Sequence, residues 1–383
     1  MKKYYMLIAF CFLCFGSGAF ANIVLDKKYF YADLSGKINL KFGYAFNENI
    51  FDIKPKDKIS SYSNANLFYL QRFSKKNQAG FNVKLGISDV IKLTELDLDE
   101  LKVEKAYLIV KNANLGSIEY GKNDLVSHKM LINTSKISAA TGGVNGDWVN
   151  YTNLRGNHKK DDGAGYDKDN VFWVKPNVYT SYHGLSHEFK QSSVNYISPE
   201  IYNFQLGLSY VLGETDDLQY SNILAAGLSY KNSISDDISI NVALTGEVAP
   251  KKEIKNSITL NNLMHWNLGM KVKYFNLDGI FSYGNGNKSG RKMNPETSNT
   301  YYLNTGIAYH SDLRKLSLTY FQSVRDIETK GINRLTAYAA SLEYPLFHGS
   351  SYYFELVKFN AEEANVTEKN SGYVFLAGLN FNL

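Results

Sequence analysis

The chain has 383 residues, a formal charge of +5 at neutral pH, and two cysteines, Cys11 and Cys14, both close to the N-terminus. This near balance of positive and negative charge argues against a nucleic-acid partner. Both cysteines fall in a segment that we expect to be removed, which excludes a catalytic thiol, a disulfide and a cysteine metal site in the mature chain.

Residues 1–21 have the pattern of a cleaved secretory signal peptide. Lys2 and Lys3 give a positive start, and the apolar run 6–15 is too short to span a bilayer. Ala19-Phe-Ala21 is a small-x-small cleavage site. We therefore expect residues 22–383 to form the mature protein as a single domain, exported to the periplasm; an uncleaved anchor helix is the alternative.

Beyond this segment no apolar run of 18 residues predicts a transmembrane helix. The chain is nevertheless rich in aromatic residues, with 29 Tyr and 22 Phe, and poor in Pro, with 6. Apolar and polar residues alternate instead. In 34–46, for example, Leu40 and Phe42 fall on one face and Lys37 and Lys41 on the other. Such alternation is typical of transmembrane β-strands, because a closed barrel satisfies its own backbone hydrogen bonds within lipid.

Sixteen runs alternate in this way, and each is predicted to be a strand. In chain order they are 34–46, 61–73, 81–88, 103–111, 115–122, 190–198, 202–212, 222–230, 238–247, 262–274, 277–284, 301–309, 315–322, 335–344, 351–359 and 373–383.

The connections between these runs differ in length according to their position. Those after even-numbered runs are mostly short, whereas those after odd-numbered runs tend to be longer and more polar. An even number of strands with short turns at one rim and long loops at the other is the layout of an outer-membrane barrel. The last run, 373–383, alternates to the end of the chain, as a strand that pairs with the first one must. The fold class predicted is therefore an all-β, antiparallel, 16-stranded transmembrane barrel.

The hairpin 103–122 is followed by the longest stretch without an alternating strand, about 123–189. A segment of that length without strands inside a compact domain is expected to have a function. We expect it to fold into the barrel as a third loop and to narrow the pore.

Several motifs resemble the general bacterial porin family of 16-stranded trimeric outer-membrane channels. Leu115-Gly-Ser-Ile-Glu-Tyr-Gly-Lys-Asn123 resembles the strand that enters that family's constriction loop, and the segment from Lys190 to Tyr210 resembles the hairpin that follows the loop. Leu34-Ser-Gly-Lys37 resembles the family's first strand. The resemblance covers the whole mature chain in architecture. It implies a homotrimer in the outer membrane.

The resemblance also implies which residues border the pore. Lys37 and Lys190 fall where the family places wall cations, whereas Asn66 and Glu104 fall where it often has arginines, so this wall is less basic. Asp147 is the one acid in the segment that resembles the loop's acidic tip. Charges of opposite sign about 8–10 Å apart across water are worth only ~0.4–2 kcal/mol, which predicts weak ion selectivity.

Other kinds of site find less support in the sequence. Asp161, Asp162, Asp167 and Asp169 lie in a mixed-charge run that lacks the spacing of a calcium loop. His183 and His187 are four residues apart, but the surrounding sequence does not favour the helix that would align them on zinc. We predict no cofactor, no metal and no enzymatic activity.

The function predicted is therefore a water-filled channel through which small hydrophilic solutes and ions diffuse passively. The protein's other contacts are expected to be outer-membrane lipid and further copies of itself. Two alternatives stay open on the sequence alone. One is an adhesin or receptor barrel that acts through its long outer loops, and the other is a hydrolase with a site at the rim.

Overall fold

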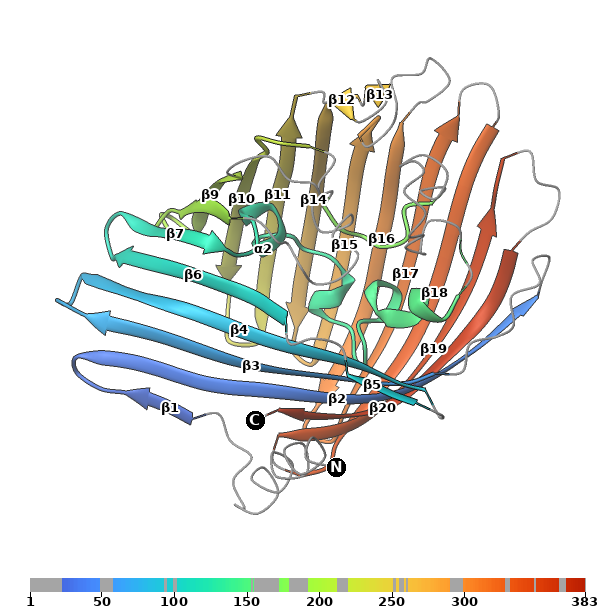
Figure 1. The fold of residues 1–383 in the computed structure, drawn as a ribbon, viewed down its shortest axis with the longest axis horizontal. Coiled ribbons are helices and arrows are strands. Elements are labelled where there is room, and N and C mark those ends of the chain that lie inside the picture. Colours follow the sequence, from blue (N-terminus) through green and yellow to red (C-terminus); the bar gives the residue numbers. More distant parts are fainter. Residues whose placement is uncertain are drawn as a thin grey trace.

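The fold is a closed barrel of sixteen antiparallel strands (Figure 1). The structure, a computed structural model, describes residues 23–48, 58–92, 95–98, 102–152, 154, 172–178, 192–211, 220–250, 253–254, 258–259, 261–289, 299–327, 331–347, 349–364 and 370–382.

Each predicted strand is present, and each pairs with its neighbours in the chain. The wall strands are β2 (Phe30–Glu48), β3 (Lys58–Arg72), β4 (Asn77–Lys92), β6 (Lys102–Asn112), β7 (Gly116–Lys122), β8 (Ser192–Ile197), β9 (Phe204–Val211), β10 (Leu224–Ser233), β11 (Ile238–Ala249), β14 (Leu263–Tyr274), β15 (Leu277–Asn287), β16 (Thr300–Ser311), β17 (Arg314–Ile327), β18 (Gly331–Pro345), β19 (Ser350–Glu362) and β20 (Asn370–Asn382).

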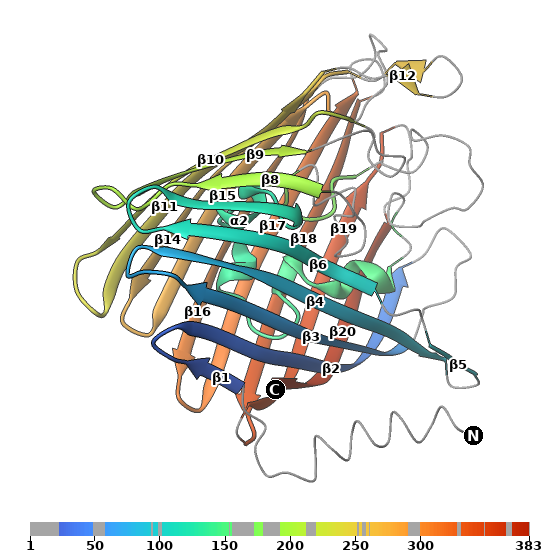
Figure 2. The same ribbon diagram turned by 60° about the vertical axis from the view of Figure 1, so that its left-hand side comes forward.

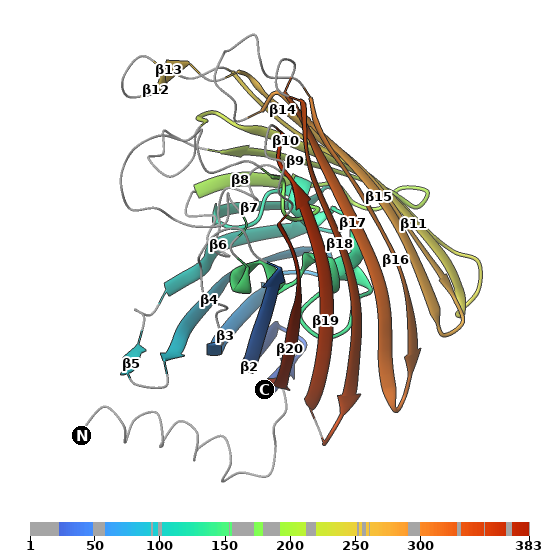
Figure 3. The same ribbon diagram turned by 90° about the vertical axis from the view of Figure 1, so that its right-hand side faces the viewer.

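The barrel closes between its first and last wall strands, as the sequence predicts. β20 pairs with β2 in a register that runs from Glu48 opposite Ser371 to Lys37 opposite Asn382 (Figure 3). Where β20 ends, the short strand β1 (Ile23–Asp26) takes over its place beside β2. The edge of β2 therefore stays covered beyond the C-terminus, and no row of backbone groups is left open at the seam.

Three short strands that the sequence does not predict extend the long-loop side of the barrel. β5 (Glu95–Leu98) pairs with β4. β12 (Glu253–Ile254) and β13 (Ile258–Thr259) form a small separate hairpin, which Figure 1 shows beyond the upper rim. Among the described residues, no helix combines the length and the apolar character needed to cross a membrane.

The outward and inward faces of the wall follow the alternation. On β2, Leu40 and Phe42 are exposed on the outside, whereas Lys41 and Ala45 face inward. Outward aromatic residues cluster near the strand ends; Tyr344 stacks on Tyr352, for example, with ring centroids 5.2 Å apart. Such residues suit the level of the lipid headgroups, where the ring meets hydrocarbon and the hydroxyl meets water.

Residues 123–152, which we call the inner segment, follow β7 and lie inside the barrel (Figures 1 and 2). The segment contains α2 (Val126–Lys129) and three 3-10 turns: η1 (Thr134–Lys136), η2 (Gly143–Asn145) and η3 (Asp147–Tyr151). Its elements contact β9 to β11, then β15 and β16, then β17 to β19, and finally β20 and β2. The inner segment thus runs along more than half of the inner wall.

Part of the inner wall under this segment, on β17 to β20, carries an apolar cluster that the alternation does not predict. Trp148 of η3 is fully buried and stacks on Phe359 of β19, with ring centroids 5.7 Å apart. Phe321, Leu335 and Val357 belong to the same buried cluster. Strands β17 to β20 therefore carry apolar side chains on both faces, because one face meets lipid and the other meets the inner segment.

Candidate functional site

The backbone of the inner segment is hydrogen-bonded to polar side chains of the wall. Each bond satisfies an amide that no regular secondary structure pairs. Four of these amide donors and their acceptors are Val126 to Ser209 Oγ (2.9 Å), Thr134 to Asn304 Oδ1 (2.9 Å), Ala139 to Ser317 Oγ (2.9 Å) and Val144 to Thr319 Oγ1 (3.1 Å).

Glu355 of β19 is a further anchor, at the middle of the segment. Its carboxylate accepts hydrogen bonds from Thr141 Oγ1 at 2.5 Å and from the Gly143 amide at 2.9 Å. The wall residue Ser341 donates a third bond at 2.9 Å. Glu355 is only 1% exposed, so these donors replace the water that an ionised carboxylate would otherwise need.

Glycines in the wall let the inner segment approach closely. A β-carbon on Gly269 of β14 would lie 2.4 Å from the carbonyl oxygen of Ile132. A β-carbon on Gly43 of β2 would lie 2.1 Å from the ring of Tyr151. These two wall positions admit the segment only because they carry no side chain.

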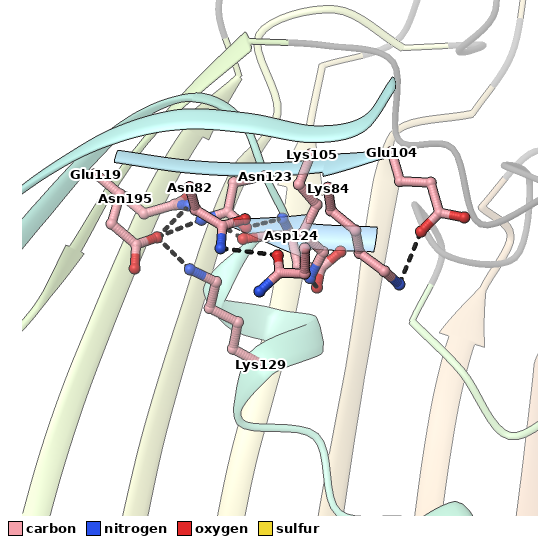
Figure 4. Close-up of polar contacts among 10 residues, drawn as sticks. Asn82, Lys84, Glu104, Lys105, Glu119, Asn123, Asp124, Lys129 and Asn195 are labelled. Carbon is pink, nitrogen blue, oxygen red and sulfur yellow. Dashed lines mark hydrogen bonds and ion pairs between the residues drawn. The ribbon is translucent and has the colours of Figure 1, made fainter. Parts of the chain in front are cut away.

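Charged side chains gather where the inner segment leaves β7, next to strands β4 and β6 (Figure 4). Lys84 of β4 pairs with Glu104 of β6 at 2.7 Å, and Tyr62 of β3 also donates to Glu104. Lys105, the next residue, pairs with Asp124 of the inner segment. A register shift between β4 and β6 lies at this point. Since a β-bulge re-aims a side chain, Glu104 and Lys105 can both face the lumen.

Glu119 of β7 holds the start of the inner segment. Its carboxylate pairs with Lys129 of α2 and accepts hydrogen bonds from Asn123 at 2.5 Å and from Asn195 of β8 at 3.3 Å (Figure 4). Burial lowers the pKa of the Lys129 ammonium below that of an ordinary lysine, although Glu119 offsets part of this effect. The Glu119 carboxylate therefore stabilises the protonated, charged form of Lys129.

The far end of the inner segment meets the wall at β2. Asp147 of η3 forms an ion pair with Lys41, whose side chain is 11% exposed. Lys175, in the described stretch 172–178, lies in the electrostatic field of Asp147 and Lys41; burial lowers its pKa, and Asp147 opposes that shift. Opposite charges from the segment and from the wall thus meet at both ends of the inner segment.

The residues predicted to border the pore lie at different places. Asp147 and Glu104 both belong to ion pairs between elements. Asn66 of β3 accepts a hydrogen bond of 2.9 Å from Asn82 of β4, beside the charged cluster. Lys37 lies on β2 four residues before Lys41, about 13 Å nearer the short-turn rim at 3.3 Å per residue. Lys190 lies outside the described residues.

Sequence reasoning missed Lys41, Lys84, Lys105 and Lys129 as site residues. Alternation placed Lys41 and Lys84 on the inward face, together with many other polar residues. It could not show which of them the inner segment would touch.

The aspartates of the run 155–169 and the pair His183 and His187 lie outside the described residues. Within the described part of the chain, no group of three His, Cys, Asp or Glu side chains could hold a metal ion.

Comparison with solved structures finds barrels of similar shape but distant sequence. They include OmpF of Salmonella typhi in complex with daunomycin, with TM-score 0.63 and 11% identity over 94% of this chain and 100% of that chain. An anion-selective porin from Comamonas acidovorans follows with TM-score 0.58 and 12% identity, over 92% and 100%. OmpT of Vibrio cholerae, in its trimer form, has TM-score 0.56 and 13% identity, over 93% and 100%.

Among curated proteins, no sequence matches. The decisive comparison is with family models: the model described as Gram-negative porin matches residues 12–364. This match spans most of the chain and includes every described strand from β1 to β19. The chain belongs to the Gram-negative porin family, and it is a barrel of the outer membrane.

Proposed function

We propose that the barrel forms a water-filled, weakly selective channel for passive diffusion of small hydrophilic solutes and ions. The observation that carries this proposal is the inner segment, which is fixed inside the barrel from α2 to η3 and brings charged groups opposite those of the wall. In a barrel of this size, the segment that occupies part of the lumen sets its narrowest section.

Weak selectivity is supported by the balance of charge in the lumen. The cations Lys41, Lys84, Lys105 and Lys129 are each paired with an acid. Other inward-facing acids, such as Glu355, accept hydrogen bonds from the inner segment. Lys37, Lys136 and Lys175 stay outside ion pairs in the described part of the chain. Because neither sign dominates, a passing ion meets a small net field; even one uncompensated charge at 8–10 Å would be worth only ~0.4–2 kcal/mol.

In this proposal, the residues predicted from the sequence border the narrow section together with the side chains that they contact. Asp147, Glu104 and Asn66 belong to it through their contacts with Lys41, Lys84 and Asn82. Lys37 and Lys190 belong to it in the proposal because they fall at the positions of wall cations.

The assembly proposed is a homotrimer, inserted after residues 1–21 are removed by cleavage behind Ala21. Support comes from the trimer form of the Vibrio cholerae OmpT barrel and from the signal-like N-terminus. Native mass spectrometry of the protein extracted from outer membranes tests both points. A mass of three chains that each begin at Asn22 is expected.

The channel itself is tested by recording from the purified protein in planar bilayers. Ohmic conductance in steps that close in groups of three is expected, with a small reversal potential in asymmetric KCl. Liposome swelling then gives the size limit for neutral sugars. A folded, heat-modifiable barrel that conducts no ions and admits no sugar would overturn the proposal.

A further inference from the structure

Residues 172–178, which we call the second segment, also lie inside the barrel. The four apolar side chains of this segment are each at most 3% exposed: Phe172, Trp173, Val174 and Val178. Three of them belong to the same buried cluster as Trp148 of η3. Apolar side chains buried to this degree indicate a packed layer and not a solvated loop.

Trp173 is held in a recess of the inner wall, near the long-loop ends of β14 to β16. Its ring stacks on that of His265, with ring centroids 5.3 Å apart and an angle of 4° between the ring planes. Tyr302 packs beside both rings, with its centroid 6.4 Å from that of Trp173 and 6.3 Å from that of His265. Among the described residues, neither ring nitrogen of His265 has a hydrogen-bond partner, so the imidazole serves Trp173 as an aromatic surface.

Two glycines on the inward face of β15 make room for these rings. A β-carbon on Gly284 would lie 2.2 Å from the ring of Tyr302. A β-carbon on Gly286 would lie 3.3 Å from the ring of His265 and 3.7 Å from that of Trp173. Because neither position carries a side chain, rings from β14, β16 and the second segment can close over β15. The recess is therefore a built feature of the wall.

The second segment lies at a different level of the lumen from the inner segment. The inner segment crosses β14 at Gly269, where a β-carbon would lie 2.4 Å from the carbonyl oxygen of Ile132. Trp173 meets the same strand at His265, four residues closer to the long-loop rim, which is about 13 Å along the strand at 3.3 Å per residue. The lumen is therefore occupied at two successive levels.

Asn133 of the inner segment joins the two levels. Its side-chain amide donates to the carbonyl of Pro176 at 2.6 Å and to Asn177 Oδ1 at 3.4 Å. The residue before Pro176 is Lys175, the only charged residue of the second segment. Lys175 is half-buried and forms no ion pair with another described residue, and it lies in the electrostatic field of Asp147. The second segment thus brings a positive charge close to the narrow section.

We propose that the second segment forms a second constriction on the long-loop side of the inner segment, fixed by the stack of Trp173 on His265, with Lys175 as its specificity-determining charge. The inference rests on the proposed channel function and adds a separate filter to it. A solute that enters from the long-loop rim meets this layer first, so bulky solutes are held back there. Small anions are favoured, because a fixed charge of opposite sign attracts them in a narrow passage. Trp173 and His265 act as positioning residues.

Removing the stack tests the size filter. In Trp173→Ala or His265→Ala the second segment loses its contact with the recess, so liposome swelling should show disaccharides entering several-fold faster relative to a monosaccharide. His265→Phe restores a ring for Trp173 and should rescue the wild-type ratio. The matched control is Trp266→Ala, which removes a tryptophan from the outer face of the same strand, where it packs on Tyr283 with ring centroids 5.4 Å apart. Heat-modifiable mobility on gels verifies that each barrel folds.

Removing the charge tests the role of Lys175. In Lys175→Gln the permeability ratio should shift towards cations by roughly 2- to 30-fold, the range for one charge acting across water. The reversal potential is recorded in asymmetric KCl at mildly acidic pH, because burial lowers the pKa of Lys175 and the charge must be present in the wild type. The same substitution in the Trp173→Ala background should give a smaller shift, since the lysine is no longer held in place.

These measurements can overturn the inference while the channel function stands. If the wild type conducts and both alanine variants of the stack keep its sugar ratio, the second segment is not a constriction. A rise of equal size in the Trp266→Ala control would assign the effect to general loosening of the barrel and would also refute the inference. An equal charge shift with and without Trp173 would show that the stack does not position Lys175. A folded wild-type protein that conducts nothing would instead refute the proposed channel itself.

Discussion

Lys41 on β2 and Asp147 on η3 form an ion pair that joins the end of the inner segment to the strand at the barrel seam. The two residues are 106 positions apart in the chain, yet they meet because the segment runs around the inner wall and returns to β2. The contact compensates a charge on each partner, and it therefore influences both the position of the segment and the field in the lumen.

Removing the cation of this pair should shift ion selectivity. In Lys41→Gln, Asp147 keeps its negative charge without compensation, so cations are favoured. At ~0.4–2 kcal/mol, the permeability ratio should change by roughly 2- to 30-fold. The reversal potential in asymmetric KCl measures this. Lys37→Gln, on the same face of β2 but nearer the short-turn rim, is the comparison that locates the narrow section along the strand. A larger shift for Lys37→Gln than for Lys41→Gln would show that the narrow section lies nearer the short-turn rim.

Removing the acid of the Lys84–Glu104 pair should shift ion selectivity in the opposite direction, towards anions. Glu104 is only 7% exposed and compensates Lys84 at 2.7 Å. In Glu104→Gln the lysine charge is left without its partner, so the channel should favour anions by a factor of about 2–10, within the same Coulomb range. The amide retains a hydrogen-bond acceptor for Tyr62, which protects the fold. An unchanged reversal potential would place this pair away from the ion path.

Alkaline pH should shift the selectivity towards cations. Burial lowers the pKa of Lys129, Lys136 and Lys175 on or near the inner segment. A lowered lysine pKa means that the positive charge is present below that pKa and is lost as pH rises through it. These three charges therefore disappear at a lower pH than an exposed lysine would require, while the acids stay ionised. Reversal potentials recorded from neutral to alkaline pH test this, and the triple Lys→Gln variant should remove most of the shift.

Glu355 should matter for the stability of the inner segment. Glu355→Ala leaves Thr141 Oγ1 and the Gly143 amide without their acceptor, and each orphaned buried donor costs about 1–3 kcal/mol. The expected result is a noisier single-channel current and faster proteolysis within residues 123–152. Ser341→Ala is the control, since it removes a bond to Glu355 that does not involve the segment. Equal noise in both variants would count against an anchoring role.

Filling a wall glycine should displace the inner segment. In Gly269→Val, the new β-carbon would lie 2.4 Å from the Ile132 carbonyl, so the backbone of the segment must move away from β14. The conductance should change because the segment occupies part of the lumen. Gly279→Val on the adjacent strand is the matched control, because its β-carbon would meet nothing within 4 Å. The idea is wrong if both valine variants conduct like the wild type.

Alternation and turn spacing in the sequence were sufficient to predict the barrel. Side chains of a strand point alternately to the two faces, so a wall between lipid and water has to alternate in sequence as well. For this reason all sixteen wall strands and the pairing of 373–383 with the first strand could be predicted. The short strand β1 escaped the prediction, because four residues are too few to establish a period.

The interior was decided by tertiary structure. Apolar residues such as Phe321 and Phe359 can point inward because the inner segment covers them. The alternation of the strands does not indicate that such a cover exists. The register shift near Glu104 and the contact of Lys41 with Asp147 depend on where distant parts of the chain meet. The sequence by itself determined which side chains of each strand point inward and which point outward. Only the folded segment decided which inward residues it covers and which of them pair, because contacts across the lumen follow no local period.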